Sequence, residues 1–394
     1  MFARPILAKS NLTKHSLSIN IIKKAVVLLI TMVVAFFAGI AGAEDTIKIA
    51  VVGPITGPVA QYGKMQMDGA SVAVEQINAK GGVLGKKLEA VLLDDVCEPR
   101  QAVAIANRVV SQGIKFVVGH LCSSATQPAT DIYDEDQILM ITPAATNPAI
   151  TEGKYPLIFR TIGLDQKQGA IAGEYIVNQV KPKNMAILHD KQQYGEGVAT
   201  EVKKYVEAKG ITPVMFDGLS KGQTNFSALI TKMQSKKVDF VYYGGYHPEL
   251  GILLRQARER GFDAGFMGPE GVGNKDISAI AGEASEGLLV TLPADFSKDP
   301  ANKELIEVFK AKKIDPTGPF VMPSYAAVQI IAETIAKTKS TDPVKIAEVM
   351  HATEYATPIG TVKYDEKGDL QDFKFVVFTW HADGSKTEAK AAAE

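Results

Sequence analysis

The decisive stretch of the sequence reads GHLCSSAT at residues 119–126, followed by ITPAAT at residues 141–146. In each segment an apolar run typical of a buried strand gives way to small hydroxyl residues, among them Ser123 and Thr146. Ligands bind at the carboxyl ends of parallel strands, and the helix that follows offers free backbone N–H groups to an anion. The two loops therefore suit one charged end of a zwitterion. Ordinary capping of two helices explains the same residues, and both interpretations stay open at this point.

Strand-like and helix-like segments alternate along the chain in two successive sets. The first set comprises expected strands at residues 47–52, 88–93, 115–118 and 138–141, with helices at 67–77, at 102–110 and from Ser123 onward. The second set comprises expected strands at 185–188, 214–216, 240–243 and 265–268, with helices at 198–208, 226–236 and 249–260. We expect three helices to follow, at 304–311, 325–337 and 344–351. The chain is then expected to end in a hairpin of residues 361–364 with 373–380 and a frayed tail from residue 386. The repeated alternation predicts two α/β lobes, each built on a parallel sheet.

The N-terminus predicts export. A basic leader without acidic residues precedes the apolar run 25–40, and Ala41-Gly42-Ala43 supplies a small-residue cleavage pattern. The apolar run is short for a membrane span, which needs about 20 residues. We therefore expect a signal peptide at residues 1–43, cleaved after Ala43, with an uncleaved anchor as the alternative. The cleavage site contains no cysteine, so we do not expect a lipid anchor there.

Composition excludes several classes of partner. The formal net charge of −1 gives no general attraction to nucleic acid or to an anionic membrane.

Cys97 and Cys122 are the two cysteines, and in an exported protein such a pair predicts a disulfide; two buried free thiols are the alternative. Two cysteines cannot build a zinc site alone, and the six histidines lack ligand spacing. We expect no metal and no cofactor.

Motifs for catalysis fail on inspection. Residues 81–86 resemble a phosphate-binding loop only faintly, because the spacing is wrong and no Ser or Thr follows the lysine. No G-x-S-x-G surrounds Ser123, so a serine hydrolase is not supported. Asp94 and Asp95 lie at a strand end and could bind a metal, but such pairs more often cap a helix or face water. The sequence therefore predicts a protein that is not an enzyme.

Aromatic residues recur in the loops that follow expected strands. Tyr62 follows the first strand, whereas Tyr194 and Tyr246 follow strands of the second set, and Glu270 comes shortly after another. Each is also compatible with an ordinary surface position. Together they predict an apolar wall with one acid, facing a cleft between the two sets.

At these residues the chain resembles the periplasmic leucine/isoleucine/valine-binding proteins, the soluble components of bacterial branched-chain amino-acid ABC importers. The resemblance covers residues 44–390. Its most specific blocks are GPVAQYG (57–63), GHLCSS (119–124), ITPAAT (141–146), HDKQQYGEG (189–197), FVYYGGYHPE (240–249) and FMGPEGV (266–272). The resemblance implies two doubly wound parallel-sheet lobes joined by three hinge crossovers, the type 1 architecture of periplasmic binding proteins.

The resemblance also implies the roles of individual residues. The ligand carboxylate would be held by Ser123 and Thr146, and its ammonium by the carbonyl of Ala144, the hydroxyl of Thr146 and the acid of Glu270. The aliphatic side chain would pack on Tyr62, Leu121, Cys122, Tyr194, Tyr246 and Phe320. The family disulfide corresponds to Cys97–Cys122. The chemistry is consistent, because a desolvated ammonium requires a counter-charge and an apolar wall favours branched aliphatic groups.

This resemblance leads to a full functional hypothesis. We expect a monomeric periplasmic protein that binds leucine, isoleucine or valine between closing lobes and delivers it to ABC permease subunits. The expected lobes are residues 44–163 with 293–372, and residues 164–292 with 373–394. An exported amino-acid or amide sensor of the same fold is the main alternative, and an exported hydrolase acting on amides or peptides is a third.

Overall fold

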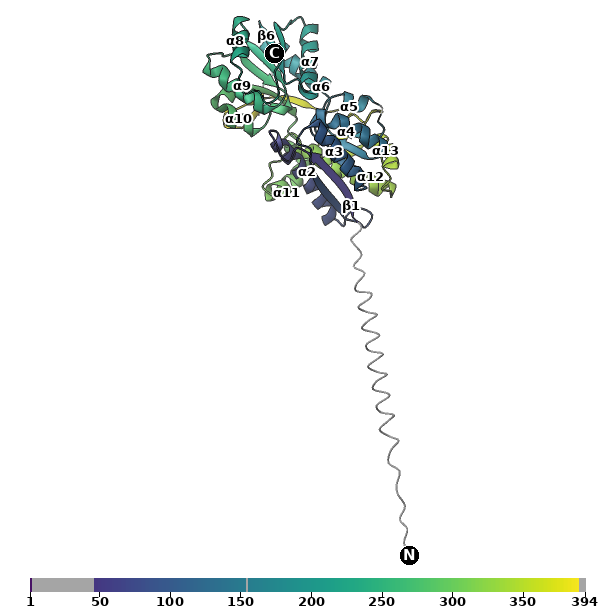
Figure 1. The fold of residues 1–394 in the computed structure, drawn as a ribbon. Helices are drawn as coiled ribbons and strands as arrows, with labels where there is room; N and C mark the ends of the chain where they lie inside the picture. Colours follow the sequence, from purple (N-terminus) through teal and green to yellow (C-terminus); the bar gives the residue numbers. More distant parts are fainter. Residues whose placement is uncertain (2–45, 154, 390–394) are drawn as a thin grey trace. The chain divides into compact units, whose positions relative to one another are not determined.

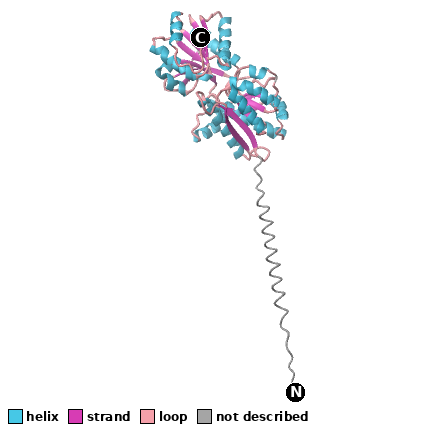
Figure 2. Ribbon diagram, in the orientation of Figure 1, coloured by secondary structure: helices cyan, strands magenta, loops and turns pink. Residues whose placement is uncertain are grey.

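The computed structural model describes Met1, residues 46–153 and residues 155–389 (Figure 1). Apart from Met1, the predicted signal peptide and its cleavage site lie outside these ranges. The described chain is a mixture of helices and strands throughout (Figure 2). Among the described residues, no helix is long and apolar enough to cross a membrane.

The first lobe is built on a parallel sheet with the strand order β2-β1-β3-β4-β5. Its strands are β1 (Ile47–Gly53), β2 (Leu88–Asp94), β3 (Phe116–Gly119), β4 (Leu139–Thr142) and β5 (Ile158–Arg160). In register, Val51 lies beside Val118, and Val118 lies beside Ile141. These strands are continuous apolar runs because both faces of a parallel sheet are covered by helices.

Helices cover both faces of this first sheet. Its helices are α2 (Ala60–Ala79), α3 (Pro99–Ser111), α4 (Ser123–Glu135), α5 (Ala149–Glu152), α11 (Lys303–Ala311), α12 (Val321–Thr338) and α13 (Pro343–His351). Successive residues of β1 point to opposite faces: Ile49 and Val51 pack in the core with α2, α12 and α13, whereas Ala50 and Val52 pack with α3 and α4. A small antiparallel pair, β11 (Tyr355–Thr357) and β12 (Gly360–Val362), belongs to the same lobe through its buried Tyr355 and Val362.

The second lobe is built on a larger mixed sheet with the order β14-β13-β10-β9-β8-β6-β7. Its strands are β6 (Met185–His189), β7 (Met215–Gly218), β8 (Phe240–Gly244), β9 (Gly265–Gly268), β10 (Leu288–Pro293), β13 (Phe375–Trp380) and β14 (Lys386–Glu388). Strands β6 to β10 are parallel, and β13 and β14 add an antiparallel edge.

Helices again cover both faces of the second sheet. One face carries α6 (Asp165–Tyr175), its π-helical continuation η1 (Ile176–Val180) and α7 (Gln193–Ala208); the other carries α8 (Ser227–Ser235), α9 (His247–Glu259) and α10 (Lys275–Ala281). The short 3-10 turns are η2 (Glu270–Val272), η3 (Gly282–Ser285), η4 (Phe296–Lys298) and η5 (Pro300–Asn302). Two lobes with largely parallel sheets confirm the predicted fold class.

The described chain passes between the two sheets at three places. It leaves the first lobe after β5, returns after β10, and leaves again after β12 to form β13. The predicted lobe boundaries fall in or beside these passages and remain predictions.

One element of the expected topology was wrong. Residues 361–364 and 373–380 do not form a hairpin, because β12 pairs with β11 whereas β13 pairs with β10 and β14. The chain between β12 and β13 is a passage between lobes, so neighbours in sequence end in different sheets. The start of the expected frayed tail, residues 386–388, is also paired, as β14.

Candidate functional site

The two loops singled out in the sequence lie at the carboxyl ends of neighbouring strands, β3 and β4. Helix α4 begins at Ser123, and no side chain caps this helix at Cys122. Its first turn therefore offers backbone N–H groups, together with the buried Ser123 hydroxyl. The hydroxyl also reaches the second loop, where it accepts the Asn147 N–H at 3.4 Å.

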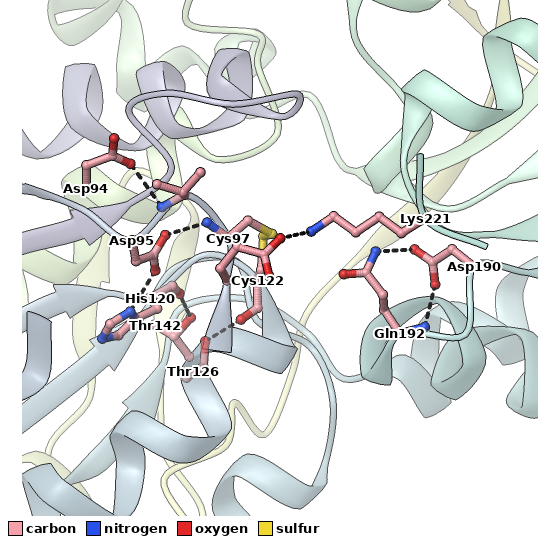
Figure 3. Close-up of a disulfide and its surroundings, with 12 residues drawn as sticks. Asp94, Asp95, Cys97, His120, Cys122, Thr126, Thr142, Asp190, Gln192 and Lys221 are labelled. Carbon is pink, nitrogen blue, oxygen red and sulfur yellow. Dashed lines mark hydrogen bonds and ion pairs between the residues drawn. A yellow bond between two sulfur atoms is a disulfide. The ribbon is translucent and has the colours of Figure 1, made fainter. Parts of the chain in front are cut away.

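Thr142 fixes the two loops against each other. Its hydroxyl donates to the carbonyl of His120 at 2.7 Å and accepts the N–H of Ala145 at 2.9 Å. The His120 ring is itself held at both nitrogens. Asp95 lies 2.7 Å from one (Figure 3), and the Tyr133 hydroxyl lies 2.9 Å from the other. Because these side chains are all buried, the network ties the two loops firmly to each other.

The predicted disulfide is present and joins the loop after β2 to the loop after β3. Cys97 and Cys122 are bonded, with their Cα atoms 5.5 Å apart, and Asp95 accepts the Cys97 N–H at 2.9 Å (Figure 3). The bond closes a loop over a sequence separation of 25, which stabilises the fold by roughly 3 kcal/mol in the chain-entropy view.

The aspartate pair considered as a metal site has other partners. Asp94 accepts the Ile55 N–H at 2.9 Å and the Thr56 hydroxyl, whereas Asp95 holds His120 and Cys97. These bonds order the loops that follow β1 and β2. Among the described residues, no group of three or more potential ligands could hold a metal ion.

The four aromatic residues predicted for the apolar wall belong to one buried cluster. Tyr62 and Phe320 come from the first lobe, with ring centroids 5.4 Å apart; Tyr194 and Tyr246 come from the second, with centroids 5.3 Å apart. Leu121, Cys122 and Ala144 complete the cluster with the other residues that pack there. Residues from both lobes thus meet over the ends of β3 and β4.

Glu270 adds a buried acid to this cluster. It opens the turn η2 after β9 and is only 1% exposed. The Tyr62 hydroxyl donates to the Glu270 carbonyl at 3.0 Å, and the Gln168 amide donates to the Glu270 carboxylate. Next to it, the Gly271 N–H donates to the Tyr194 hydroxyl at 3.0 Å. Burial raises the pKa of Glu270 to about 8, because the charged form loses its hydration.

Most of the predicted site residues line one small cavity of about 10 Å³ between the lobes. Its lining consists of Leu121, Ser123, Ala144, Tyr194, Tyr246, Glu270, Gly271 and Phe320. Tyr62 and Cys122 pack in the surrounding cluster. Thr146 is fully buried, and its hydroxyl has no hydrogen-bond partner in the described structure.

Two buried polar residues at the site were missed in the sequence. Asp165 and Gln168 occupy the first turns of α6, and the Asp165 N–H donates to the Thr146 carbonyl at 3.0 Å. Asp165 Oδ1 and Gln168 Oε1 lack partners within the described chain, as does the Thr146 hydroxyl. Burial raises the pKa of Asp165 to about 7, against the opposing effects of the nearby Thr146 hydroxyl and of Arg160. Unpaired buried acceptors are costly, so this corner suits a group that donates several hydrogen bonds.

A larger cavity, of about 570 Å³, lies elsewhere in the described chain. Its lining includes Met65, Trp380 and Lys386, and it contains none of the predicted site residues. We place the candidate site at the small cavity, since the convergent polar groups, the helix start and the buried acid are all there.

Comparison with known proteins places the chain in a family. A family model described as "Periplasmic binding protein" matches residues 46–385. The chain belongs to the periplasmic binding protein family. This membership agrees with the two α/β lobes of the described chain.

Curated relatives of this periplasmic binding protein match it over nearly its whole length. A leucine-, isoleucine-, valine-, threonine- and alanine-binding protein of Pseudomonas aeruginosa is 59% identical, covering 92% of this chain and 97% of the relative. A Leu/Ile/Val-binding protein of Escherichia coli K12 is 52% identical, covering 93% and 99%.

Solved structures agree in fold. A leucine-binding protein of Thermotoga maritima superposes with a TM-score of 0.81 at 28% identity, covering 87% of this chain and 98% of the other. A substrate-binding protein of Desulfitobacterium hafniense, solved in complex with Leu, gives 0.74 at 27% identity, covering 88% and 100%.

Proposed function

We propose that this periplasmic binding protein is the soluble substrate-binding component of an ABC importer for branched-chain amino acids. It binds leucine, isoleucine or valine between its lobes and presents the loaded form to the permease subunits. The relatives named for leucine, isoleucine and valine binding support this assignment. The observation that carries it is one cavity lined by a helix start, a buried acid and an aromatic wall. Such a protein binds its ligand without chemical change, so it is not an enzyme.

The ligand carboxylate lies at the start of α4 in this proposal. Ser123 contributes its hydroxyl and backbone N–H, and Thr146 contributes its hydroxyl, which is otherwise unpaired. Uncharged donors and the positive end of the helix dipole stabilise an anion without a basic residue. The site therefore accepts a neutral zwitterion without bringing in an extra positive charge.

The ligand ammonium lies between the lobes. The carbonyl of Ala144 and the hydroxyl of Thr146 reach it from the first lobe, and the carboxylate of Glu270 from the second. Ammonium requires a counter-charge in a desolvated site, because an unpaired buried charge costs several kcal/mol. Glu270 is the acid in the cavity lining, and the lining contains no lysine or arginine that would compete with the ligand ammonium for its carboxylate.

The aliphatic side chain packs on the aromatic wall. Tyr62, Tyr194, Tyr246 and Phe320 surround it, with Leu121 and Cys122 beneath. Each buried CH₂ contributes about 0.8 kcal/mol, which favours leucine, isoleucine and valine over small polar amino acids. Discrimination among the three is modest, about 10–200-fold per methylene at most.

Motion of the lobes follows from the size of the cavity. A space of about 10 Å³ is far smaller than the roughly 150 Å³ that holds a benzene-sized group, so the lobes open to admit the ligand. Contacts such as the Tyr62–Glu270 bond belong to the closed arrangement, which the ligand favours by touching both lobes.

In this proposal the signal peptide is cleaved after Ala43, and the mature protein works as a monomer in the periplasm.

Mass spectrometry of gently purified protein tests the proposal, since a retained amino acid names the ligand. Titration calorimetry with leucine, isoleucine and valine then gives the affinities, with lysine and aspartate as charged controls. Tight binding of the three aliphatic ligands and none of the controls is expected. Binding of neither leucine, isoleucine nor valine would overturn the assignment.

A further inference from the structure

A second cavity, of about 260 Å³, adjoins the ligand cavity on the far side of Tyr246. Tyr246 is common to the linings of both. Apolar groups dominate the second lining; they are Pro58, Val59, Val96, Cys97, Pro248 and Ile252 together with Tyr246. The two lobes supply opposite walls, so this cavity, like the ligand cavity, lies between them.

The charged residues of this second cavity are engaged with other groups. Lys221 pairs with Glu98 at 2.5 Å, reaching from the second lobe toward the disulfide (Figure 3). The Glu249 carboxylate accepts the Gly222 N–H at 2.7 Å. With these groups already paired, the space left at the centre of the cavity suits apolar atoms rather than a charged ligand.

Tyr246 is held less firmly than the other two tyrosines of the site. The Tyr62 hydroxyl is bonded to the Glu270 carbonyl, and the Tyr194 hydroxyl to the Gly271 N–H. Within the described residues, the structure assigns no hydrogen bond to the Tyr246 hydroxyl; its ring packs on Tyr194 and its backbone forms the N-cap of α9. Rotation about its side-chain bonds therefore breaks no hydrogen bond, unlike rotation of Tyr62 or Tyr194.

We propose that Tyr246 is a movable partition, and that its rotation joins the two cavities so that amino acids with apolar side chains longer than leucine, such as methionine and phenylalanine, also bind. This inference rests on the proposed function and extends its range of ligands. The second cavity has the capacity, since about 260 Å³ exceeds the roughly 150 Å³ that holds benzene. Leucine, isoleucine and valine fill the first cavity and leave the partition in place.

Ile252 provides the test, because it is half-buried on α9 and lines the second cavity but not the first. Ile252→Trp fills the second cavity with an indole. Calorimetry on wild-type protein is expected to show binding of leucine, methionine and phenylalanine. The variant should lose at least about tenfold in affinity for phenylalanine and methionine, while its leucine affinity stays within about threefold of wild type.

Arg255→Trp is the matched control. Arg255 lies one turn further along α9, is about half exposed and lines neither cavity, so this indole should leave all three affinities unchanged. Ile252→Phe repeats the test with a smaller ring if the tryptophan variant melts well below wild type.

Each remaining outcome overturns the partition. Wild-type protein that binds leucine but neither methionine nor phenylalanine refutes it and leaves the proposed function intact. Equal losses for leucine and phenylalanine in both Ile252 variants, or the same selective loss in Arg255→Trp, refute it as well. Wild-type protein that binds none of the aliphatic ligands refutes the proposed function itself.

Discussion

Glu270→Gln isolates the charge that the proposed site offers to a ligand ammonium. The substitution keeps the shape and the hydrogen-bonding capacity of the side chain and removes its negative charge. Glu270 is 1% exposed, lines the ligand cavity and receives a hydrogen bond from Gln168. We expect leucine affinity to fall because the ammonium then enters a desolvated site without a counter-charge.

The size of the loss depends on pH. Removing one partner of a buried pair costs about 3–5 kcal/mol. With a pKa of about 8, the wild-type carboxyl must first lose a proton at pH 7. This deprotonation costs the wild-type protein about 1.4 kcal/mol and reduces its advantage over the variant by that amount. A net loss of about 1.6–3.6 kcal/mol remains, or roughly 14- to 370-fold in affinity.

The sign of the pH dependence follows from the raised pKa. Wild-type affinity for leucine should rise between pH 6 and pH 8, as the carboxyl ionises more readily, and the gap to Glu270→Gln should widen accordingly. Folding has the opposite dependence: an acid whose pKa is raised on folding lowers stability as pH climbs from its unfolded value toward about 8. The ligand-free variant should therefore melt no lower than wild type at pH 7.

Titration calorimetry at several pH values makes this comparison. Glu249→Gln is the matched control, a buried glutamate of the same lobe that does not line the ligand cavity, and its leucine affinity should stay within about twofold of wild type. A loss below tenfold for Glu270→Gln at pH 7.5, or a loss that does not grow with pH, would refute Glu270 as the ammonium partner.

Other expected outcomes address the framework and the motion. Thiol labelling in denaturant without reductant should find no free thiol on Cys97 or Cys122 in protein expressed in the periplasm, and two labelled cysteines per chain would contradict the disulfide. Thr142→Val should weaken leucine binding and lower the melting temperature, since it leaves the His120 carbonyl and the Ala145 N–H unpaired at about 1–3 kcal/mol; unchanged affinity would show that the loops hold without it. Leucine should reduce the radius of gyration in small-angle scattering and raise the melting temperature with its concentration; an unchanged radius at calorimetric saturation would exclude closure.

Apolar runs in the sequence predicted most strands of the structure, because a parallel sheet covered on both faces requires them. Strand β5 escaped prediction for a physical reason. It is only three residues long and ends in Arg160, a fully buried arginine whose charge is compensated by Asp369 at 2.5 Å. The compensating residue is more than 200 positions away, so the local pattern carries no sign that a charged residue belongs in the core. Helix α6, which follows β5, was missed with it.

The candidate site was predictable where it depends on local features. Hydroxyl residues at the ends of β3 and β4 mark their loops directly, and Ser123 and Ala144 line the cavity as expected. The assembly of the two halves is a tertiary property, illustrated by the bond from Tyr62 to Glu270 across 208 positions. Sequence spacing cannot specify that bond, so the resemblance to a family supplied the set of partners.

Asp165, which the sequence did not single out, changes the electrostatic account of the site. It shares the buried corner with Glu270. Burial is the main cause of both raised pKa values, and repulsion from the Asp165 charge raises the pKa of Glu270 further. Because burial raises both pKa values, to about 7 and about 8, the pair is less negatively charged at neutral pH than two exposed carboxylates would be. A zwitterion that brings one ammonium can be neutralised there, because its positive charge lowers the cost of ionising a single carboxyl. A side chain bearing a second positive charge would require both acids to ionise within an apolar wall. In the proposed binding mode, this arrangement would therefore favour ligands with one ammonium and an uncharged side chain.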